Sequence, residues 1–210
     1  MRRTATTANA ILGLLALRPA WPTYAITTQL RRTMRFFWPR AESRIYDEAR
    51  RLVGRGLAAA ESVPAGRRTR TVYAITPDGR AALARWLAAP PRATTLECEP
   101  LLRVFLADLC TPAQLRAALD RVRADADAIL AVGREVGPEY LAGTAPFQDQ
   151  LHARALVFDF LWSHALMLHG WAERADAAIA GWDASSPAAR AEAARATIRD
   201  HLAADAPGAS

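Results

Sequence analysis

Hydrophobic residues in the first part of the chain recur at helical spacing in three successive segments. Because residues three and four positions apart share one face of a helix, we predict helices over 8–17, 23–34 and 40–55. The predicted inward face of the second helix consists of Tyr24, Ile26, Thr27, Leu30 and Met34. The predicted inward face of the third consists of Ala41, Ile45, Ala49 and Leu52. The outward side of the third helix then holds Arg40, Ser43, Arg44, Asp47, Arg50 and Arg51.

The pattern changes after Gly56, where the third helix is expected to stop. Residues 57–61 and 69–75 fit two paired strands, and the second strand alternates with a period of two. The turn between them, residues 64–68, carries cations. A fourth helix is expected to start at Thr76-Pro77 and to end before Pro90. Three helices followed by a hairpin with a basic tip is the order of a winged helix-turn-helix domain.

The second half contains only helical patterns, over residues 99–110, 112–135, 147–181 and 187–204. Thr111 is the expected cap of the second of these helices, with Pro112 in its first turn. We therefore predict a mainly α protein: a winged helix-turn-helix domain with a two-stranded wing over residues 1–92, then an all-α dimerisation domain. That second domain, also a candidate effector domain, covers 93–183, and 184–210 forms a C-terminal helix or tail.

The helix predicted over 147–181 is apolar on nearly every side. A helix of this kind has to be covered on several faces, which a small helical domain cannot do alone. The sequence therefore predicts a homodimer formed through this helix. The candidate interface is the stripe Leu151, Ala155, Phe158, Trp162, Ala165 and His169.

Charge is distributed unevenly along the 210 residues, although the formal net charge is only +6. Residues 1–92 hold 17 arginines against 5 acids, net +12, whereas residues 93–210 hold 10 arginines against 16 acids, net −6. There is no lysine. An anionic partner is therefore expected for the first half only. Arginine can bind guanine in the major groove with two hydrogen bonds, and wing arginines can meet phosphates, so double-stranded DNA is the predicted partner.

The candidate DNA contacts fall on two elements of this topology. The groove-helix candidates are Arg40, Arg44, Arg50 and Arg51, and the wing candidates are Arg67, Arg68 and Arg70.

Several short motifs resemble those of the PadR-type transcriptional regulators over about residues 9–90. They are Ile11-Leu12-Gly13-Leu14-Leu15-Ala16, Tyr24-Ala25-Ile26, Ser43-Arg44-Ile45-Tyr46, Arg51-Leu52-Val53-Gly54-Arg55-Gly56-Leu57 and Val72-Tyr73-Ala74-Ile75-Thr76-Pro77-Asp78-Gly79-Arg80. The resemblance implies a homodimeric winged-helix regulator, commonly a repressor that releases its operator on binding a small, often aromatic molecule. Two groove helices about one helical turn apart then predict a pseudo-palindromic operator. The resemblance also implies that Ser43 and Tyr46 lie at the DNA face.

The chain departs from the family pattern at two places. Pro22-Thr23 stands where the family usually has His-Gly, and Asp47 stands where proline commonly follows the tyrosine. A carboxylate at position 47 either accepts a hydrogen bond from a cytosine amino group or repels phosphate.

Aromatic residues provide candidate effector contacts, because flat apolar rings suit aromatic molecules. The candidates are Trp86, Phe158, Trp162, His164 and Trp171. The alternative for each of them is ordinary packing in the core or the interface.

Catalytic signatures are missing from the sequence. The four histidines lack metal-ligand spacing, and there is neither a glycine-rich phosphate loop nor a G-x-S-x-G motif, so we predict no enzyme, no cofactor and no metal. Two alternatives stay open: a winged-helix module that binds protein without DNA, and a small-molecule enzyme resting on Asp159 and His164.

The compartment is inferred from cysteine content and hydropathy. Two cysteines cannot form a disulfide framework, and the longest apolar run, 156–168, is too short to span a bilayer. We expect a cytoplasmic protein with no membrane partner.

Overall fold

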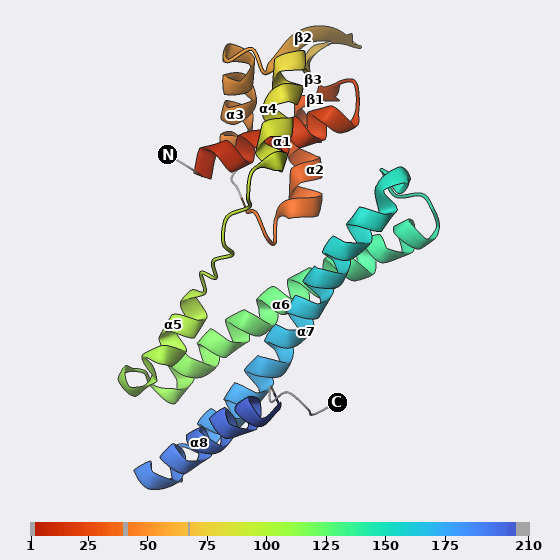
Figure 1. Ribbon diagram of the computed structural model, residues 1–210. Helices are drawn as coiled ribbons and strands as arrows, with labels where there is room; N and C mark the ends of the chain where they lie inside the picture. The colour runs from red at the N-terminus through yellow and green to blue at the C-terminus, as the bar shows by residue number, and fades with distance from the viewer. Residues whose placement is uncertain (1–2, 40–41, 67, 205–210) are drawn as a thin grey trace. The chain divides into compact units, whose positions relative to one another are not determined.

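The computed structural model describes residues 3–39, 42–66 and 68–204. The chain divides into two compact units, residues 1–95 and 96–210. The first combines helices with a small antiparallel sheet, and the described part of the second is helical (Figure 1). The boundaries predicted at residues 92 and 183 stay predictions.

The first unit follows the predicted order of elements with one addition. Its elements are α1 (Arg3–Leu17), β1 (Trp21–Pro22), α2 (Thr23–Met34), α3 (Glu42–Gly54), β2 (Ala58–Ala65), β3 (Arg68–Ile75) and α4 (Pro77–Ala88). The addition is β1, which pairs antiparallel with β3 so that Trp21 lies opposite Tyr73. The sheet order is β1-β3-β2, so the predicted two-stranded wing is part of a three-stranded sheet.

The core of the first unit lies between its helices and the inner side of the sheet. Ile11, Leu12 and Leu15 of α1, Ile26 of α2 and Leu52 of α3 are almost fully buried. Burying each such side chain contributes about 1.5–3 kcal/mol to folding. These contacts hold α3 against α1 and thereby fix which side of α3 faces outward.

Of the five residues predicted to share one face of α2, three are buried, Met34 is half-buried and Tyr24 is exposed. Ile26, Thr27 and Leu30 are buried, whereas Tyr24 is 61% exposed. Tyr24 lies in the first turn of α2, directly after the β1 strand. Tyr24 therefore does not share the buried face on which the helical spacing places it.

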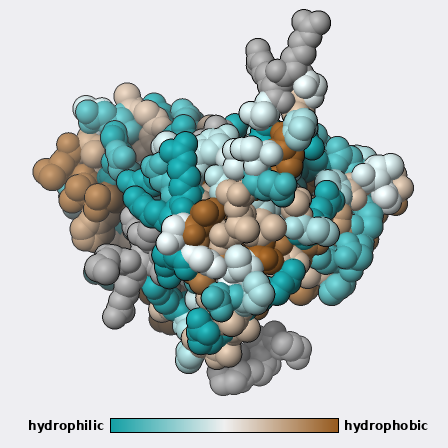
Figure 2. All heavy atoms as spheres, turned by 90° about the horizontal axis from the view of Figure 1, so that it is seen from above, coloured by the Kyte–Doolittle hydropathy of each residue, from teal (hydrophilic) through white to brown (hydrophobic). Residues whose placement is uncertain are grey.

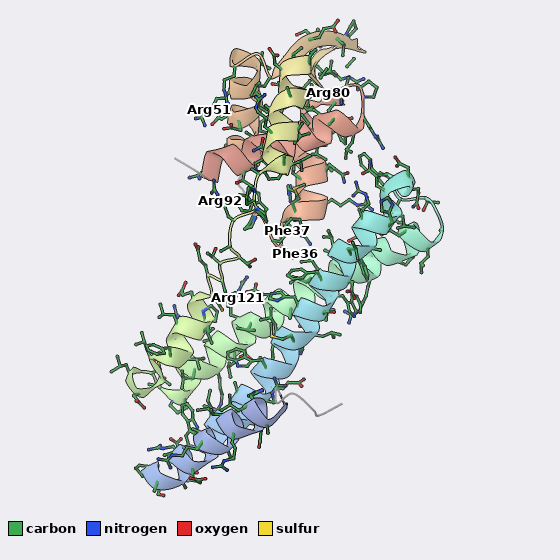
Figure 3. All side chains as sticks on the ribbon, viewed as in Figure 1. Phe36, Phe37, Arg51, Arg80, Arg92 and Arg121 are labelled. Atoms are coloured by element: carbon green, nitrogen blue, oxygen red, sulfur yellow. The ribbon has the colours of Figure 1, made fainter. Side chains whose placement is uncertain are left out.

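The turn between α2 and α3 is aromatic, with Phe36 and Phe37 in it (Figure 3). The backbone N–H of Trp38 donates to Met34 O at 2.7 Å, and its indole N–H donates to Thr7 Oγ1 of α1 at 3.4 Å. These hydrogen bonds anchor the turn to the body of the unit, directly before α3.

The end of α3 and the start of α4 are joined through a compact set of hydrogen bonds from the backbone and from the Thr76 hydroxyl. Gly56 has a φ of +71° and closes α3 in a Schellman arrangement, with Leu57 N donating to Leu52 O at 2.9 Å. Thr76 caps α4 by accepting from Gly79 N at 3.0 Å, and its hydroxyl donates to Gly56 O at 2.7 Å. The strands of the wing are thus tied at their base to the helix that precedes them.

The second unit consists of α5 (Glu99–Phe105), a short 3₁₀ turn η1 (Ala107–Leu109), α6 (Pro112–Leu141), a second turn η2 (Gln148–Gln150), α7 (Leu151–Ala180) and α8 (Pro187–Ala204). The predicted cap of α6 is confirmed as a capping box, in which Gln114 N donates to Thr111 Oγ1 at 3.3 Å and Thr111 N to Gln114 Oε1 at 2.8 Å. Two boundaries differ from the prediction. The segment 99–110 breaks into α5 and η1, and α6 runs six residues past position 135 to Leu141, through Pro138.

Helices α6 and α7 form a long antiparallel hairpin within the second unit (Figure 1). Two buried clusters lie along their contact. One contains Leu115, Leu119 and Ile179, and the other contains Ala126, Leu130 and Ala165. Because alanines occupy several of these positions, the two backbones can approach closely.

Candidate nucleic-acid interface

Helix α3 has one buried face and one exposed face. The predicted core residues Ile45, Ala49 and Leu52 are all buried, each less than 5% exposed. Ala41 and Arg40 lie outside the described residues. The other predicted outward residues, Ser43, Arg44, Asp47, Arg50 and Arg51, are all exposed, and Tyr46 is half-buried.

Glu48 is a buried carboxylate that the sequence analysis did not single out. It is 3% exposed, and its Oε2 lies 3.3 Å from Nη1 of Arg51, which is itself 63% exposed. A buried charge needs a partner, because leaving it unpaired costs several kcal/mol. Arg51 therefore has a structural task in addition to any contact with DNA. Glu48 follows Ile45 by three positions and therefore lies on the inward stripe of α3. This spacing is the sequence signal that marks Glu48 as buried.

Asp47 and Arg50 form a second pair with the same spacing but a different character. Their closest atoms are 4.0 Å apart, and both side chains are more than half exposed. Such surface pairs contribute little to stability. Arg44 makes no hydrogen bond or ion pair with the described side chains, so two guanidinium groups on this face, those of Arg44 and Arg50, are available to an anion.

The wing contributes one described cation. Arg70 is exposed on β3 and pairs across the sheet with Val63 of β2. Arg67 and the side chain of Arg68 lie outside the described residues. In β3, alternate residues point to opposite sides of the sheet, and Tyr73 on the other side is buried, so Arg70 faces away from the core.

The described outward face of α3 is therefore polar and mostly cationic. Arg51 projects from its outer side (Figure 3). The space-filling view shows hydrophilic side chains over most of the visible surface, with hydrophobic ones in separate small patches (Figure 2). A helix with one exposed face of guanidinium groups has the width and the donors to enter a major groove.

In the second unit, the predicted interface stripe of α7 faces α6 of the same chain over most of its length. Ala165 is fully buried, and a Cβ on Gly133 of α6 would lie 2.9 Å from the Trp162 ring. Nε2 of His169 lies 2.9 Å from Oδ1 of Asp127. Phe158 also approaches α6, whereas Leu151 is half-buried and Ala155 is exposed.

The opposite face of α7 is apolar and exposed. Leu156, Phe160 and Met167 are 73%, 62% and 53% exposed, and they lie about half a turn away from the α6 contact. Phe160 stacks on His164, with ring centres 6.2 Å apart. This face has no cover in the described part of the chain.

The effector candidates lie in different surroundings within their own units. Phe158 and Trp162 stack with ring centres 5.7 Å apart, and the guanidinium of Arg134 lies 5.9 Å from the Trp162 ring. Trp171 instead packs against the cluster of Leu115, Leu119 and Ile179, and Trp86 is 42% exposed on α4 of the first unit. Among the candidates within the described part of the second unit, Phe158 and Trp162 lie together with a cation beside them.

The contact between α6 and α7 is also held by charge. Arg123 of α6 donates to Asp176 Oδ2 at 2.9 Å and to Ala172 O at 3.3 Å on α7, and to Asp120 Oδ1 at 2.7 Å on its own helix. Burial alone would lower the pKa of Arg123, but its hydrogen bonds and ion pairs with Asp176 and Asp120 outweigh burial and raise it. The side chain is therefore a permanent charged link between the two helices.

The described part of the chain contains neither a cluster of metal ligands nor a membrane-spanning helix. No three His, Cys, Asp or Glu side chains gather there as a metal site requires. None of the described helices is long and apolar enough to cross a membrane.

Residues 11–85, which contain α2, α3, the wing, about half of α1 and most of α4, match the family model described as the transcriptional regulator PadR-like family. The chain carries a PadR-like domain. The expected resemblance is thereby confirmed, and the matched family is one of transcriptional regulators and not of enzymes, as predicted. Of the two residues that the resemblance implies at the DNA face, Ser43 is exposed and Tyr46 is half-buried on α3.

Solved structures resemble the chain beyond the PadR-like domain. The PadR-like transcriptional regulator BC1756 from Bacillus cereus matches with a TM-score of 0.71 at 16% identity, covering 83% of this chain and 98% of that one. Bacillus subtilis PadR in complex with operator DNA matches with a TM-score of 0.68 at 21% identity, covering 82% and 98%. The same protein in complex with p-coumaric acid matches with a TM-score of 0.63 at 21% identity, covering 85% and 97%. The predicted fold, a winged helix followed by helices, is confirmed; no curated protein matches the sequence.

Proposed function

We propose that this protein is a homodimeric, sequence-specific DNA-binding transcriptional regulator, acting as a repressor that a small aromatic effector releases from its operator. The observation that carries the proposal is the exposed face of α3, where Arg44 and Arg50 present guanidinium groups while the opposite face is buried. The similarity to a PadR solved with operator DNA supports it. Because the proposed ligand is DNA, we also propose a cytoplasmic location.

The test of DNA binding compares arginines with different surroundings. A duplex is first selected from a randomised library, and its affinity is then measured for wild type, Arg44→Ala, Arg50→Ala and Arg70→Ala. Arg51→Ala is unsuitable, because it would also strip Glu48 of its partner. Arg116→Ala, an exposed arginine on α6, is the matched control.

The arginines on α3 and on the wing are expected to act differently. Arg44→Ala and Arg50→Ala should cost about 1–3 kcal/mol each and relax base preference, because they remove contacts to base edges. Arg70→Ala should lower the affinity for all DNA sequences about equally. It should also reduce the steepness of log K against log salt concentration by about 0.9, as the loss of one phosphate contact does. If none of the three changes affinity more than Arg116→Ala does, the assignment of α3 and the wing is wrong.

The proposed dimer uses the exposed face of α7 together with Leu151 and Ala155, the two residues at the N-terminal end of the predicted stripe. Leu156, Phe160 and Met167 form an apolar strip that a second copy could cover. Two groove helices would then lie about 34 Å apart on a pseudo-palindromic site. Phe160→Glu should convert the dimer to monomers in sedimentation, and a stably folded wild-type monomer at micromolar concentration would contradict the proposal.

The proposed effector contact is the stack of Phe158 and Trp162 beside Arg134. A flat aromatic ligand with a negative charge suits stacked rings and a guanidinium. The structure of PadR with p-coumaric acid makes that acid the first probe. By linkage, operator DNA must weaken the affinity for the acid by the same factor by which the acid weakens DNA binding, a coupling of about 1–3 kcal/mol. Equal affinity for the acid with and without operator would refute this release mechanism.

A further inference from the structure

Asp47 occupies the middle of the exposed face of α3. Residues three and four positions away on a helix are its neighbours on the surface, and for Asp47 these are Ser43, Arg44, Arg50 and Arg51. All five side chains are exposed. A single carboxylate is thus set among three guanidinium groups, on the surface proposed to enter the groove.

Stability does not account for a carboxylate at this place. The Asp47 side chain is 56% exposed, and its nearest charged atom, on Arg50, is 4.0 Å away. Exposed pairs of this kind contribute little. The neighbouring carboxylate of Glu48 is the contrast, because it is buried and closely paired with Arg51.

Nonspecific affinity for DNA does not account for it either. A negative charge in a cationic face opposes the attraction to phosphate. Asp47 is the sixth residue of α3, in the N-terminal half of the helix, which is the part of a recognition helix that contacts base edges. The position is therefore suited to reading a base.

The chemistry of a carboxylate decides which base it can read. Ionised aspartate only accepts hydrogen bonds, so the acceptors of guanine (O6 and N7) and thymine (O4) repel it. Adenine offers an amino group, but its N7 acceptor lies beside that group. Cytosine presents its N4 amino group to the major groove without an adjacent acceptor.

We propose that Asp47 is a specificity-determining residue of this protein, which accepts a hydrogen bond from N4 of one cytosine in each half-site. The proposal rests on the DNA-binding function proposed above. Arg44, Arg50 and Arg51 supply donors on the same face, whereas Asp47 supplies the complementary acceptor. The expected half-site therefore combines guanines with one obligatory cytosine.

The experiment measures base preference at every position of the selected duplex. Affinities are determined for all single-base-pair variants with wild type, Asp47→Ala, Asp47→Asn and the control Asp78→Asn. Asp78 is an exposed carboxylate on α4 of the same unit, so its change removes the same charge away from α3. Circular dichroism verifies the helix content of each variant.

Among the G·C pairs that wild type prefers, one per half-site should owe to Asp47 a preference of at least about 5-fold over the other base pairs. Asp47→Ala should reduce that preference below about 2-fold and bind the other variants more tightly. Asp47→Asn should move the preference toward adenine, because an amide matches both N6 and N7 of that base. Asp78→Asn should leave the pattern unchanged.

The failures of the two proposals are distinguishable. If wild type retains no duplex from the library, the DNA-binding function is refuted and the role of Asp47 with it. If wild type binds a selected duplex but has no cytosine-specific position, only the role of Asp47 is refuted. The same holds if Asp47→Ala keeps the full preference for cytosine.

Discussion

Replacement of Gly79 by alanine tests how tightly α4 is joined to the base of the wing. A Cβ at this position would lie 2.0 Å from Leu57 O and 2.9 Å from Cγ1 of Ile75. The first distance is about 1.4 Å shorter than the 3.4 Å at which ordinary contact begins. The obstructing atom belongs to backbone, so it cannot turn away as the end of a flexible side chain could.

The cost follows from what holds that carbonyl in place. Leu57 O accepts from Thr76 N at 3.2 Å, while Leu57 N closes the end of α3. Overpacking costs about 1–3 kcal/mol, and the loss of one hydrogen bond adds about 0.5–1.5 kcal/mol. We expect Gly79→Ala to lower the free energy of unfolding of the first unit by about 2–4 kcal/mol. For a unit of this size, that lowers Tm by roughly 10–30 °C.

The control is the same substitution at Gly13, in α1, where a Cβ would meet no atom within 4 Å. Gly13→Ala should raise stability by about 0.5–1 kcal/mol, because alanine is the better helix former. Calorimetry measures both variants, and hydrogen exchange of peptides from residues 1–95 assigns the transition to the first unit. Equal Tm values for the two variants would show that the contact with Leu57 does not constrain α4.

Three further substitutions address the second unit. Arg123→Ala should destabilise it by about 1.5–3 kcal/mol, because two helices lose a charged link, and thermal unfolding should show a lower Tm. Arg121→Ala, which removes an exposed pair within α6 alone, should leave Tm nearly unchanged, and equal effects of the two arginines would contradict this reasoning. Thr111→Ala should cost about 1 kcal/mol through the lost cap of α6; hydrogen exchange in the first turn of α6 should rise, and unchanged exchange would contradict the capping role.

Local sequence signals predicted most helices and both strands of the wing, but β1 was missed. Its two residues, Trp21 and Pro22, are too few for a strand pattern, and proline usually argues against a strand. The pairing arises from contact with Tyr73 and Val72, some fifty residues later. Interactions between distant segments of this kind leave no local periodicity.

Helix α6 was predicted to end too early for a related reason. Glycines at 133 and 137 and proline at 138 are signals for ending a helix. In the structure the helix continues to Leu141, and Gly133 lies against the ring of Trp162. The absence of a side chain at this position allows a close approach of α7, so packing outweighs helix propensity.

The sequence predicted the exposed face of α3 better than the faces of α7. The outward direction of Ser43, Arg44, Arg50 and Arg51 follows from helical spacing and agrees with their exposure. On α7 the stripe predicted as a dimer interface packs mostly on α6 of the same chain, because a helix that is apolar all round gives no signal for which face its own chain covers. The role of each exposed arginine in binding stays a prediction that the affinity measurements decide.

The described cations on the exposed face of α3 are all arginines, which limits how this protein can be regulated. Guanidinium groups stay protonated at every physiological pH, and the chain has no lysine whose charge acetylation could remove. Arginine methylation would leave the charge in place. If α3 binds DNA as proposed, its attraction to phosphate is constant in the cell. Release then has to come from a change in the position of the two groove helices, and dissociation by the effector should be almost independent of pH.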